Sequence, residues 1–267
     1  MTLLTKRMVE KPWGKDILPA PFVAPEGKRI GEVWFEPPPE MPSILVKYIF
    51  TSEKLSVQVH PSDAQTQAMG LGRQGKEECW LVIDAEPGAT LAIGFQQDIA
   101  ADSLFDAVLD GSVEHMLTWH PVAAGDFFYI PANTVHAIGA GITLVEVQQN
   151  SDITYRLYDY SRPRALHIKD GLAVALRGPH PGHHHRKLSP NCAAQLVEGP
   201  DFRLDRIHGP PELSVAARYT GAVLVAPLSC TVMINKQLVL PGECALAASL
   251  AAIEFPASGL SLITQPV

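Results

Sequence analysis

The chain has 267 residues, 46% of them hydrophobic, which is enough to fill the core of one large domain or of two smaller ones. Its formal net charge of −7 at pH 7 argues against nucleic acid and anionic membranes as main partners, so an anionic ligand has to be held by a local group of basic side chains. No apolar run approaches the ~18 residues of a membrane span, and none of the four cysteines forms a CxxC pair, so we expect a cytoplasmic protein with reduced thiols.

The first quarter of the chain predicts two strands after an irregular start. Residues 1–42 are rich in proline and are expected to form a wrap with one strand near 31–35. The apolar run 44–50 (ILVKYIF) predicts a buried strand. Lys47 in its middle either reaches out from a sheet edge or faces a polar cavity.

The middle of the chain predicts more strands around one helix. Segments 79–83 and 90–95 have the pattern of a hairpin, with Pro87 and Gly88 in its turn. Helical spacing over 98–109 predicts a helix that stops before Gly111, and one more turn is expected at 114–117. Strands are expected at 79–83, 90–95, 127–130, 143–148 and 154–158.

The last third returns to strands after a connector. Prolines break residues 161–200 repeatedly, and only 167–176 has the spacing of a short helix. None of the later strands clusters polar side chains, so we expect a second β-barrel that packs without doing chemistry. These strands are expected at 204–208, 213–218, 222–226, 230–234, 244–249, 252–255 and 260–264.

Four polar side chains, distant in sequence, have the chemistry of a metal site. Gln58 and His60 share one face of the alternating strand 56–60, and inward polar groups need partners because burying them unsatisfied is costly. Glu78 follows in the sequence, and His136 is the best later candidate for a fourth ligand. One amide, two imidazoles and one carboxylate suit zinc, although manganese, iron or cobalt would also fit.

Segment 125–136 (GDFFYIPANTVH) resembles the second cupin motif, with Asn133 where glycine is usual. Asparagine tolerates the left-handed turn conformation nearly as well as glycine, so the departure is mild. Together with SVQVHP, GKEECW and EVQQNSDITYRLYDY, this motif makes residues 30–165 similar to type I mannose-6-phosphate isomerase in its short bacterial form. The C-terminal half resembles that family only loosely.

The resemblance implies a mainly β fold of two cupin-like (jelly-roll) β-barrels with a few short helices. We expect a catalytic metal-binding cupin domain over 1–165, a proline-rich connector over 166–200 and a non-catalytic cupin-like barrel over 201–267. Longer relatives insert a helical domain for which this chain has no room, which leaves open what covers the pocket.

The resemblance also implies a reaction: the interconversion of D-mannose 6-phosphate and D-fructose 6-phosphate through a cis-enediol. Arg156 would stabilise the enediolate, Lys76 and Ser56 would contact the phosphate or its approach, and Glu146 is preferred over Lys76 as the base. Asp152 is implied as a second buried acid. The implied ligands of one Zn²⁺ are Gln58, His60, Glu78 and His136.

Alternatives stay open for several residues and for the function. Arg156 could pair with Asp152 or Asp159, and Glu146 could be a buried hydrogen-bonding residue. The triplet His183–His185 fits a solvated, mobile loop better than a metal site or a lid. A cupin isomerase or epimerase for another sugar phosphate, and a non-catalytic sugar-phosphate sensor, are the rival functions. The protein is expected to be a monomer or a homodimer.

Overall fold

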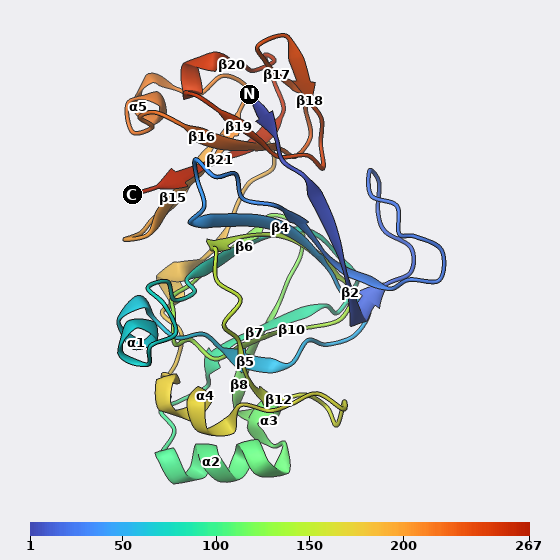
Figure 1. Cartoon of the computed structure of the whole chain (residues 1–267). Helices are drawn as coiled ribbons and strands as arrows, with labels where there is room; N and C mark the ends of the chain where they lie inside the picture. The colour runs from blue at the N-terminus through green and yellow to red at the C-terminus, as the bar shows by residue number, and fades with distance from the viewer.

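The computed structural model describes residues 1–267 and consists mainly of β-strands arranged in two barrels (Figure 1). The first barrel is a sandwich of a seven-stranded and a five-stranded antiparallel sheet. The larger sheet has the order β13 (His185–Lys187), β9 (Asp126–Ile130), β6 (Glu78–Ala85), β11 (Ile142–Gln149), β4 (Ile44–Phe50), β3 (Ile30–Phe35) and β2 (Lys6–Lys15). The smaller sheet has the order β12 (Tyr155–Tyr158), β5 (Val57–Val59), β10 (His136–Ile138), β7 (Thr90–Phe95) and β8 (Leu117–Pro121).

The second barrel combines a six-stranded and a three-stranded sheet, in the upper part of Figure 1. Its larger sheet has the order β1 (Thr2–Leu3), β19 (Ala245–Ala247), β16 (Val223–Pro227), β21 (Leu260–Pro266), β15 (Phe202–His208) and β14 (Ala194–Glu198). Its smaller sheet has the order β18 (Gln237–Val239), β17 (Val232–Ile234) and β20 (Ile253–Glu254). The fold class expected from the sequence, mainly β with two cupin-like barrels, is confirmed.

Few helices accompany the strands, and every helix is too short or too polar to cross a membrane. The predicted helix before Gly111 is present as α2, and Gly111 ends it in the left-handed conformation at φ 85°. The helical segments are α1 (Asp63–Ala68), α2 (Ala101–Asp110), α3 (Val113–Met116), α4 (Ile168–Val174) and α5 (Leu213–Ala216), with 3₁₀ turns η1 (Gly182–His184) and η2 (Leu250–Ala252).

Apolar side chains hold the layers together. The outer face of the seven-stranded sheet packs on the six-stranded sheet of the second barrel, through residues such as Phe35, Val147 and Phe202. The outer face of the five-stranded sheet is covered by helices, with Leu104 of α2 and Val174 of α4 against Val57 of β5. Inside the first barrel, an apolar cluster fills only part of the space. The remaining interior is therefore free for a site.

Three predicted elements are wrong. Segments 79–83 and 90–95 do not form a hairpin, because β6 pairs with β9 and β11 whereas β7 pairs with β8 and β10. The turn between them carries the chain from one sheet to the other, and turn residues alone cannot distinguish these two outcomes. The expected strand 213–218 is instead the short helix α5 after a proline pair. The expected irregular wrap over 1–42 contains the ten-residue strand β2.

The three-part division of the chain stays a prediction, and three strand pairs cross its boundaries. Strand β13, within the expected connector 166–200, pairs with β9 of the first barrel. The N-terminal strand β1 pairs with β19 of the second barrel. Strand β14 begins within the expected connector 166–200 and pairs with β15. The start of the expected catalytic domain and the end of the expected connector are therefore both tied to the second barrel by backbone hydrogen bonds.

Candidate metal centre and cavity

The four predicted ligands meet inside the first barrel. His136 of β10 lies opposite Gln58 of β5 in the strand register, and Glu78 reaches them from β6 in the facing sheet. The ligand atoms of His60, Glu78 and His136 all lie within 4.8 Å of one another. The side-chain nitrogen of Gln58 lies 3.2 Å from His136 Nε2. The register of three strands thus gathers residues that are 78 positions apart in sequence.

Both histidines are oriented by backbone carbonyls. Nδ1 of His60 lies 2.9 Å from the carbonyl oxygen of Ile153, and Nδ1 of His136 lies 2.9 Å from that of Thr134. A proton on each Nδ1 leaves Nε2 with its lone pair directed at the cluster, as in metal-binding histidines. Burial lowers the pKa of both rings and, together with the Lys76 charge, outweighs the opposing Glu78 charge at His136. The neutral imidazoles that a metal needs are therefore the stable form.

Glu78 supplies the negative charge of the cluster. It is fully buried, its Oε2 pairs with Lys76, and its Oε1 accepts no hydrogen bond. Oε1 lies 3.2 Å from His136 Nε2. Burial acts to raise the pKa of this carboxyl, but the Lys76 ammonium, through its charge and its hydrogen bond, outweighs it and holds the pKa below its usual value. An ionised buried carboxylate with an orphaned oxygen beside two imidazole lone pairs fits a divalent cation.

Asn133 links the cupin-like motif to the first histidine. It adopts the predicted left-handed conformation, with φ 71°. Its backbone N–H donates to the carbonyl oxygen of His60 at 2.7 Å, and its side-chain nitrogen donates to Gln65 Oε1 at 2.6 Å. A glycine at this position would supply the turn but not the bond to Gln65. The asparagine therefore fixes the loops that carry two of the ligands.

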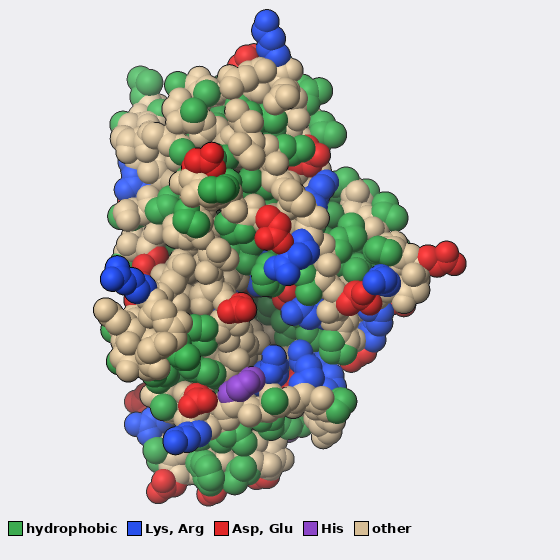
Figure 2. Space-filling view, in the orientation of Figure 1, with side chains coloured by type: hydrophobic (Ala, Val, Ile, Leu, Met, Phe, Trp, Pro, Cys, Tyr) green, Lys and Arg blue, Asp and Glu red, His purple; other side chains and the backbone are tan.

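A cavity of about 490 Å³ occupies the polar part of the barrel interior. Every second residue of the surrounding strands lines it, as the strand period requires. Six Lys and Arg side chains face it against three carboxylates, so the cavity is locally positive although the chain is acidic. Lys and Arg side chains gather around a hollow in Figure 2. The charged lining residues are Arg7, Lys11, Glu32, Lys47, Lys76, Glu146, Asp152, Arg156 and Arg164.

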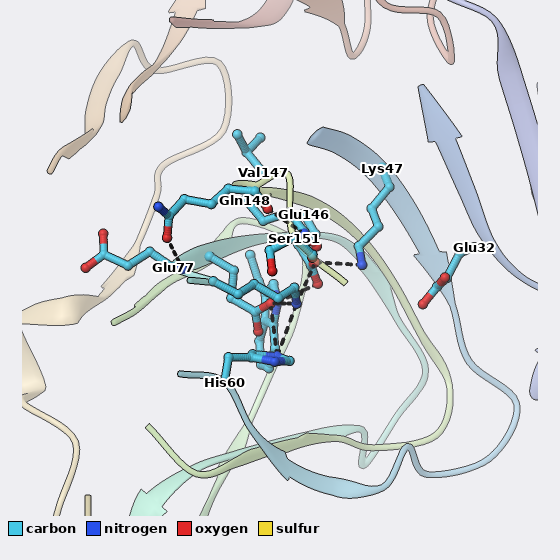
Figure 3. A network of polar contacts seen from close by, with 12 residues as sticks. Glu32, Lys47, His60, Glu77, Glu146, Val147, Gln148 and Ser151 are labelled. Carbon is cyan, nitrogen blue, oxygen red and sulfur yellow. Dashed lines mark hydrogen bonds and ion pairs between the residues drawn. The ribbon is translucent and has the colours of Figure 1, made fainter. Parts of the chain in front are cut away.

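Glu146 is the centre of a buried ion-pair network on the wall of the cavity (Figure 3). Its Oε1 lies 2.8 Å from Lys47 Nζ and 3.5 Å from Lys76 Nζ, while its Oε2 accepts a hydrogen bond from Trp80 at 3.0 Å. Lys47 is buried and faces this polar cavity, which answers the question left open by the sequence. The Trp80 ring in turn stands edge-on to His136, with centroids 5.3 Å apart. The network thus connects the cavity wall to the candidate metal ligands.

The remaining predicted site residues also lie at the cavity. Arg156 faces Gln58 in the register of β12 and β5, and its guanidinium donates only to the carbonyl oxygen of Ala165, at 2.9 Å. It forms no ion pair with Asp159, which binds Arg162 and Arg164 instead. Arg156 is therefore a cation without a carboxylate partner.

Three further residues implied by the resemblance, Ser56, Asp152 and Lys76, also line the cavity. Ser56 donates to Gln58 Oε1 at 3.2 Å, beside the cluster. Asp152 lines the cavity but is exposed, so the implication that it is a buried acid is wrong. It sits in the loop before β12, where no strand covers it. Lys76 is buried between Glu78 and Glu146.

Several cavity residues were missed by the sequence reasoning. Arg7 and Lys11 reach the cavity from β2, and Trp34 reaches it from β3. The Arg7 guanidinium stacks on the Trp34 ring, 4.2 Å from its centroid. Charged and apolar residues come in pairs in the segment 6–13 (KRMVEKPW) and do not alternate, so the sequence carries no strand signal there. Strand β2 thus forms part of the cavity wall.

The histidine triplet lies elsewhere. His183 and His184 form part of η1 and line a separate cavity of about 520 Å³ between the two barrels. His185 begins β13 and stacks on Phe128, with ring centroids 4.1 Å apart. The expectation of a solvated loop is therefore wrong for His185, because strand pairing with β9 orders it.

Known proteins share both the sequence motifs and the fold. No family model matches the chain. It is 43% identical to a mannose-6-phosphate isomerase of Streptococcus mutans over 141 residues, which are 51% of this chain and 44% of that protein. It is 39% identical to mannose-6-phosphate isomerase ManA of Bacillus subtilis over 164 residues, 58% of this chain and 52% of that protein. The chain spans about half the length of the curated relatives it matches.

Solved structures extend the likeness to the whole fold. The mannose 6-phosphate isomerase structure from B. subtilis superposes with a TM-score of 0.78 at 21% identity, covering 99% of both chains. A point mutant of phosphomannose isomerase from Salmonella typhimurium gives 0.74 at 13% identity, covering 100% of this chain and 99% of the other. The chain is thus similar to mannose-6-phosphate isomerases in sequence over half its length and in fold over nearly all of it, as the resemblance to the type I family implied.

Proposed function

We propose that this protein interconverts D-mannose 6-phosphate and D-fructose 6-phosphate in a metal-dependent reaction. The carrying observation is the buried His60–Glu78–His136 cluster beside a locally positive cavity, whose lining residues Gln58 and Lys76 contact the cluster. The matched relatives named mannose-6-phosphate isomerase support the choice of substrate. Four free cysteines support a reducing compartment such as the cytoplasm. A monomer or a homodimer is compatible with this cavity, because one chain supplies its whole lining.

The donor set suits one Zn²⁺, held by Gln58, His60, Glu78 and His136. Nitrogen and oxygen donors of this kind also fit other divalent transition metals. With one carboxylate among the four, the bound ion keeps a net charge of about +1. When bound, the metal polarises the sugar carbonyl and its neighbouring hydroxyl.

The chain's own residues supply the remaining steps. After ring opening, Glu146 takes the proton from C2 of the aldose and returns it to C1, while the hydroxyl proton moves from O2 to O1. Lys47 and Trp80 hold the carboxylate at the cavity wall. Arg156, which has no carboxylate partner, stabilises the negative charge of the cis-enediolate. Lys76 and Ser56, which line the cavity beside the metal ligands Glu78 and Gln58, contact the substrate on its approach to the reacting position.

The decisive experiment measures metal content and turnover together. Metal is quantified before and after chelation, and fructose 6-phosphate formation is followed from mannose 6-phosphate and, in parallel, from glucose 6-phosphate. Glu78→Gln and His136→Ala are expected to lose metal and turnover, whereas Arg156→Ala keeps metal and loses rate. Turnover by metal-free protein, or an unchanged rate in Arg156→Ala, contradicts the proposal.

The neighbouring residue offers a matched control. Glu77 points away from the cluster and accepts a hydrogen bond from Tyr129 at 2.6 Å (Figure 3). Glu77→Gln removes a carboxylate one position from Glu78 and should retain both metal and rate. Preferential turnover of glucose 6-phosphate would support the rival isomerase. Tight sugar-phosphate binding without chelator-sensitive turnover would support the sensing module.

A further inference from the structure

His167 is a cavity residue to which the reaction steps above give no role. It lines the same cavity as Arg156 and Arg164 and lies immediately before helix α4. Its backbone N–H donates to the carbonyl oxygen of Arg156 at 2.7 Å. Its Nδ1 accepts a hydrogen bond from the backbone N–H of Arg156 at 3.2 Å. Two reciprocal hydrogen bonds therefore tie His167 to one residue of β12.

These bonds complete the edge of a sheet. Strand β12 is the outermost strand of the five-stranded sheet, so its outer N–H and C=O groups have no ladder partner. His167 satisfies both groups at Arg156, one through its backbone and one through its ring. The position of His167 is consequently fixed by the Arg156 backbone, which also carries the Arg156 guanidinium.

The hydrogen bond to Nδ1 also determines which ring nitrogen carries the proton. A nitrogen that accepts a hydrogen bond has to present its lone pair, so the neutral His167 ring carries its proton on Nε2. No protein group accepts from His167 Nε2 among the hydrogen bonds of the structure, and the ring is partly exposed at the cavity. The ring thus offers one uncommitted N–H donor to a ligand.

The strand order places the His167 backbone two strand spacings from that of Gln58, one of the candidate metal ligands. Arg156 lies opposite Gln58, and His167 lies one step beyond Arg156. With neighbouring strands about 4.8 Å apart, the His167 backbone lies roughly two spacings, or ~10 Å, from that of Gln58. The reacting carbons of an open-chain sugar 6-phosphate belong at the inner end of this line. The phosphate, at the other end of the carbon chain, then belongs at the outer end of this line, beside His167.

We infer that His167 is a substrate-positioning residue whose Nε2–H donates a hydrogen bond to a phosphoryl oxygen of the sugar phosphate. The neighbouring Arg164 is held in two hydrogen bonds of 2.6 Å to Asp159, so its guanidinium is largely committed within the protein. The uncommitted imidazole can bind the anion without breaking an ion pair. This inference rests on the proposed function, because it takes the reacting end of the substrate to be at the metal cluster.

Two substitutions separate the roles of the two ring nitrogens. His167→Asn places an amide oxygen near Nδ1, where it can still accept from the Arg156 N–H, but it has no donor at the position of Nε2. His167→Gln places an amide N–H near Nε2 and loses the acceptor near Nδ1. A purely structural role of the histidine would make the glutamine variant the worse of the two. Phosphate binding would make the asparagine variant the worse.

The test combines steady-state kinetics with inhibition by inorganic phosphate. A hydrogen bond to a charged group far from the reacting carbons is made equally in ground and transition states, so its loss raises KM and leaves kcat within about twofold. We expect His167→Asn to raise both KM for mannose 6-phosphate and the phosphate inhibition constant about tenfold. His167→Gln should stay within about threefold of wild type, since it keeps a donor. His115→Asn, at an exposed histidine on α3, is the matched control.

The outcomes are distinct from those of the proposed function. An unchanged KM in His167→Asn, a loss confined to kcat, or a glutamine variant weaker than the asparagine variant overturns the inference while isomerase activity stands. Absence of turnover in the wild-type metalloenzyme overturns the proposed function itself. Thermal unfolding of both variants identifies any loss of fold, and the glutamine variant then still reports on the donor.

Discussion

Replacing Lys47 by methionine tests the energetic role of the buried network. Lys47 is 6% exposed and Glu146 is 2% exposed, and their charged atoms lie 2.8 Å apart. Burial acts to lower the pKa of Lys47, but Glu146 and Glu32 outweigh it and raise the pKa above its usual value. Lys47 is therefore charged throughout the neutral range.

The expected loss of stability in Lys47→Met follows from the Glu146 charge that remains. Removing one partner of a buried pair typically costs about 3–5 kcal/mol, because the other charge is left uncompensated. Methionine retains most of the apolar stem, so little packing is lost. Lys76 still lies 3.5 Å from the same carboxylate oxygen, which compensates part of the loss. We therefore expect Lys47→Met to lower the free energy of unfolding by about 3 kcal/mol, the lower end of that range.

Urea unfolding at pH 7, followed by tryptophan fluorescence, measures this change. Adding Glu146→Gln to Lys47→Met removes the stranded charge and should recover part of the stability, which a double-mutant cycle quantifies. Lys28→Met is the control, since Lys28 pairs with Glu10 in solvent and should contribute less than about 1 kcal/mol. If Lys47→Met proves as mild as Lys28→Met, the reasoning from burial is refuted.

Further predictions concern pH and backbone conformation. Burial acts to raise the pKa of Glu32, but Lys47 and Lys11 outweigh it and hold the pKa below its usual value of 4.5. The stability that the ionised Glu32 contributes is therefore lost as the pH falls below 4.5. The urea midpoint of Glu32→Gln should accordingly decline less steeply between about pH 4.5 and 3 than that of wild type. Burial lowers the pKa of His180 to about 4, so the unfolded chain binds more protons between pH 4 and 6.5 and stability rises with pH there. His180→Gln should flatten that rise, and an equally steep rise would contradict it. Asn133→Ala removes the polar side chain whose local hydrogen bonds make φ 71° tolerable, and should cost about 1–2 kcal/mol by thermal unfolding. Asn133→Gly should retain the turn, losing chiefly the hydrogen bond to Gln65.

The sequence was informative where a local pattern carries the constraint. Alternation in the strand around Gln58 and His60 places both on one face whatever the strand pairs with. The motif ending at His136 specifies a left-handed turn, and Asn133 adopts it. Glycine likewise ended the predicted helix, because Gly111 adopts a positive φ at little cost. The mainly β fold and the residues of the candidate metal centre were therefore predictable, whereas the cavity residues Arg7, Lys11 and Trp34 were not.

What the sequence by itself determined about this protein is thus which side chains share a strand face and where the chain turns, because both depend on backbone preferences of adjacent residues. Only the tertiary structure decided which strands pair. It separated β6 from β7, placed β2 at the cavity, and left Arg156 without a carboxylate partner while Arg164 took Asp159. It also brought His167 to the edge of β12. These outcomes depend on hydrogen bonds and charges between residues distant in sequence, which compete for partners only once the barrel has closed.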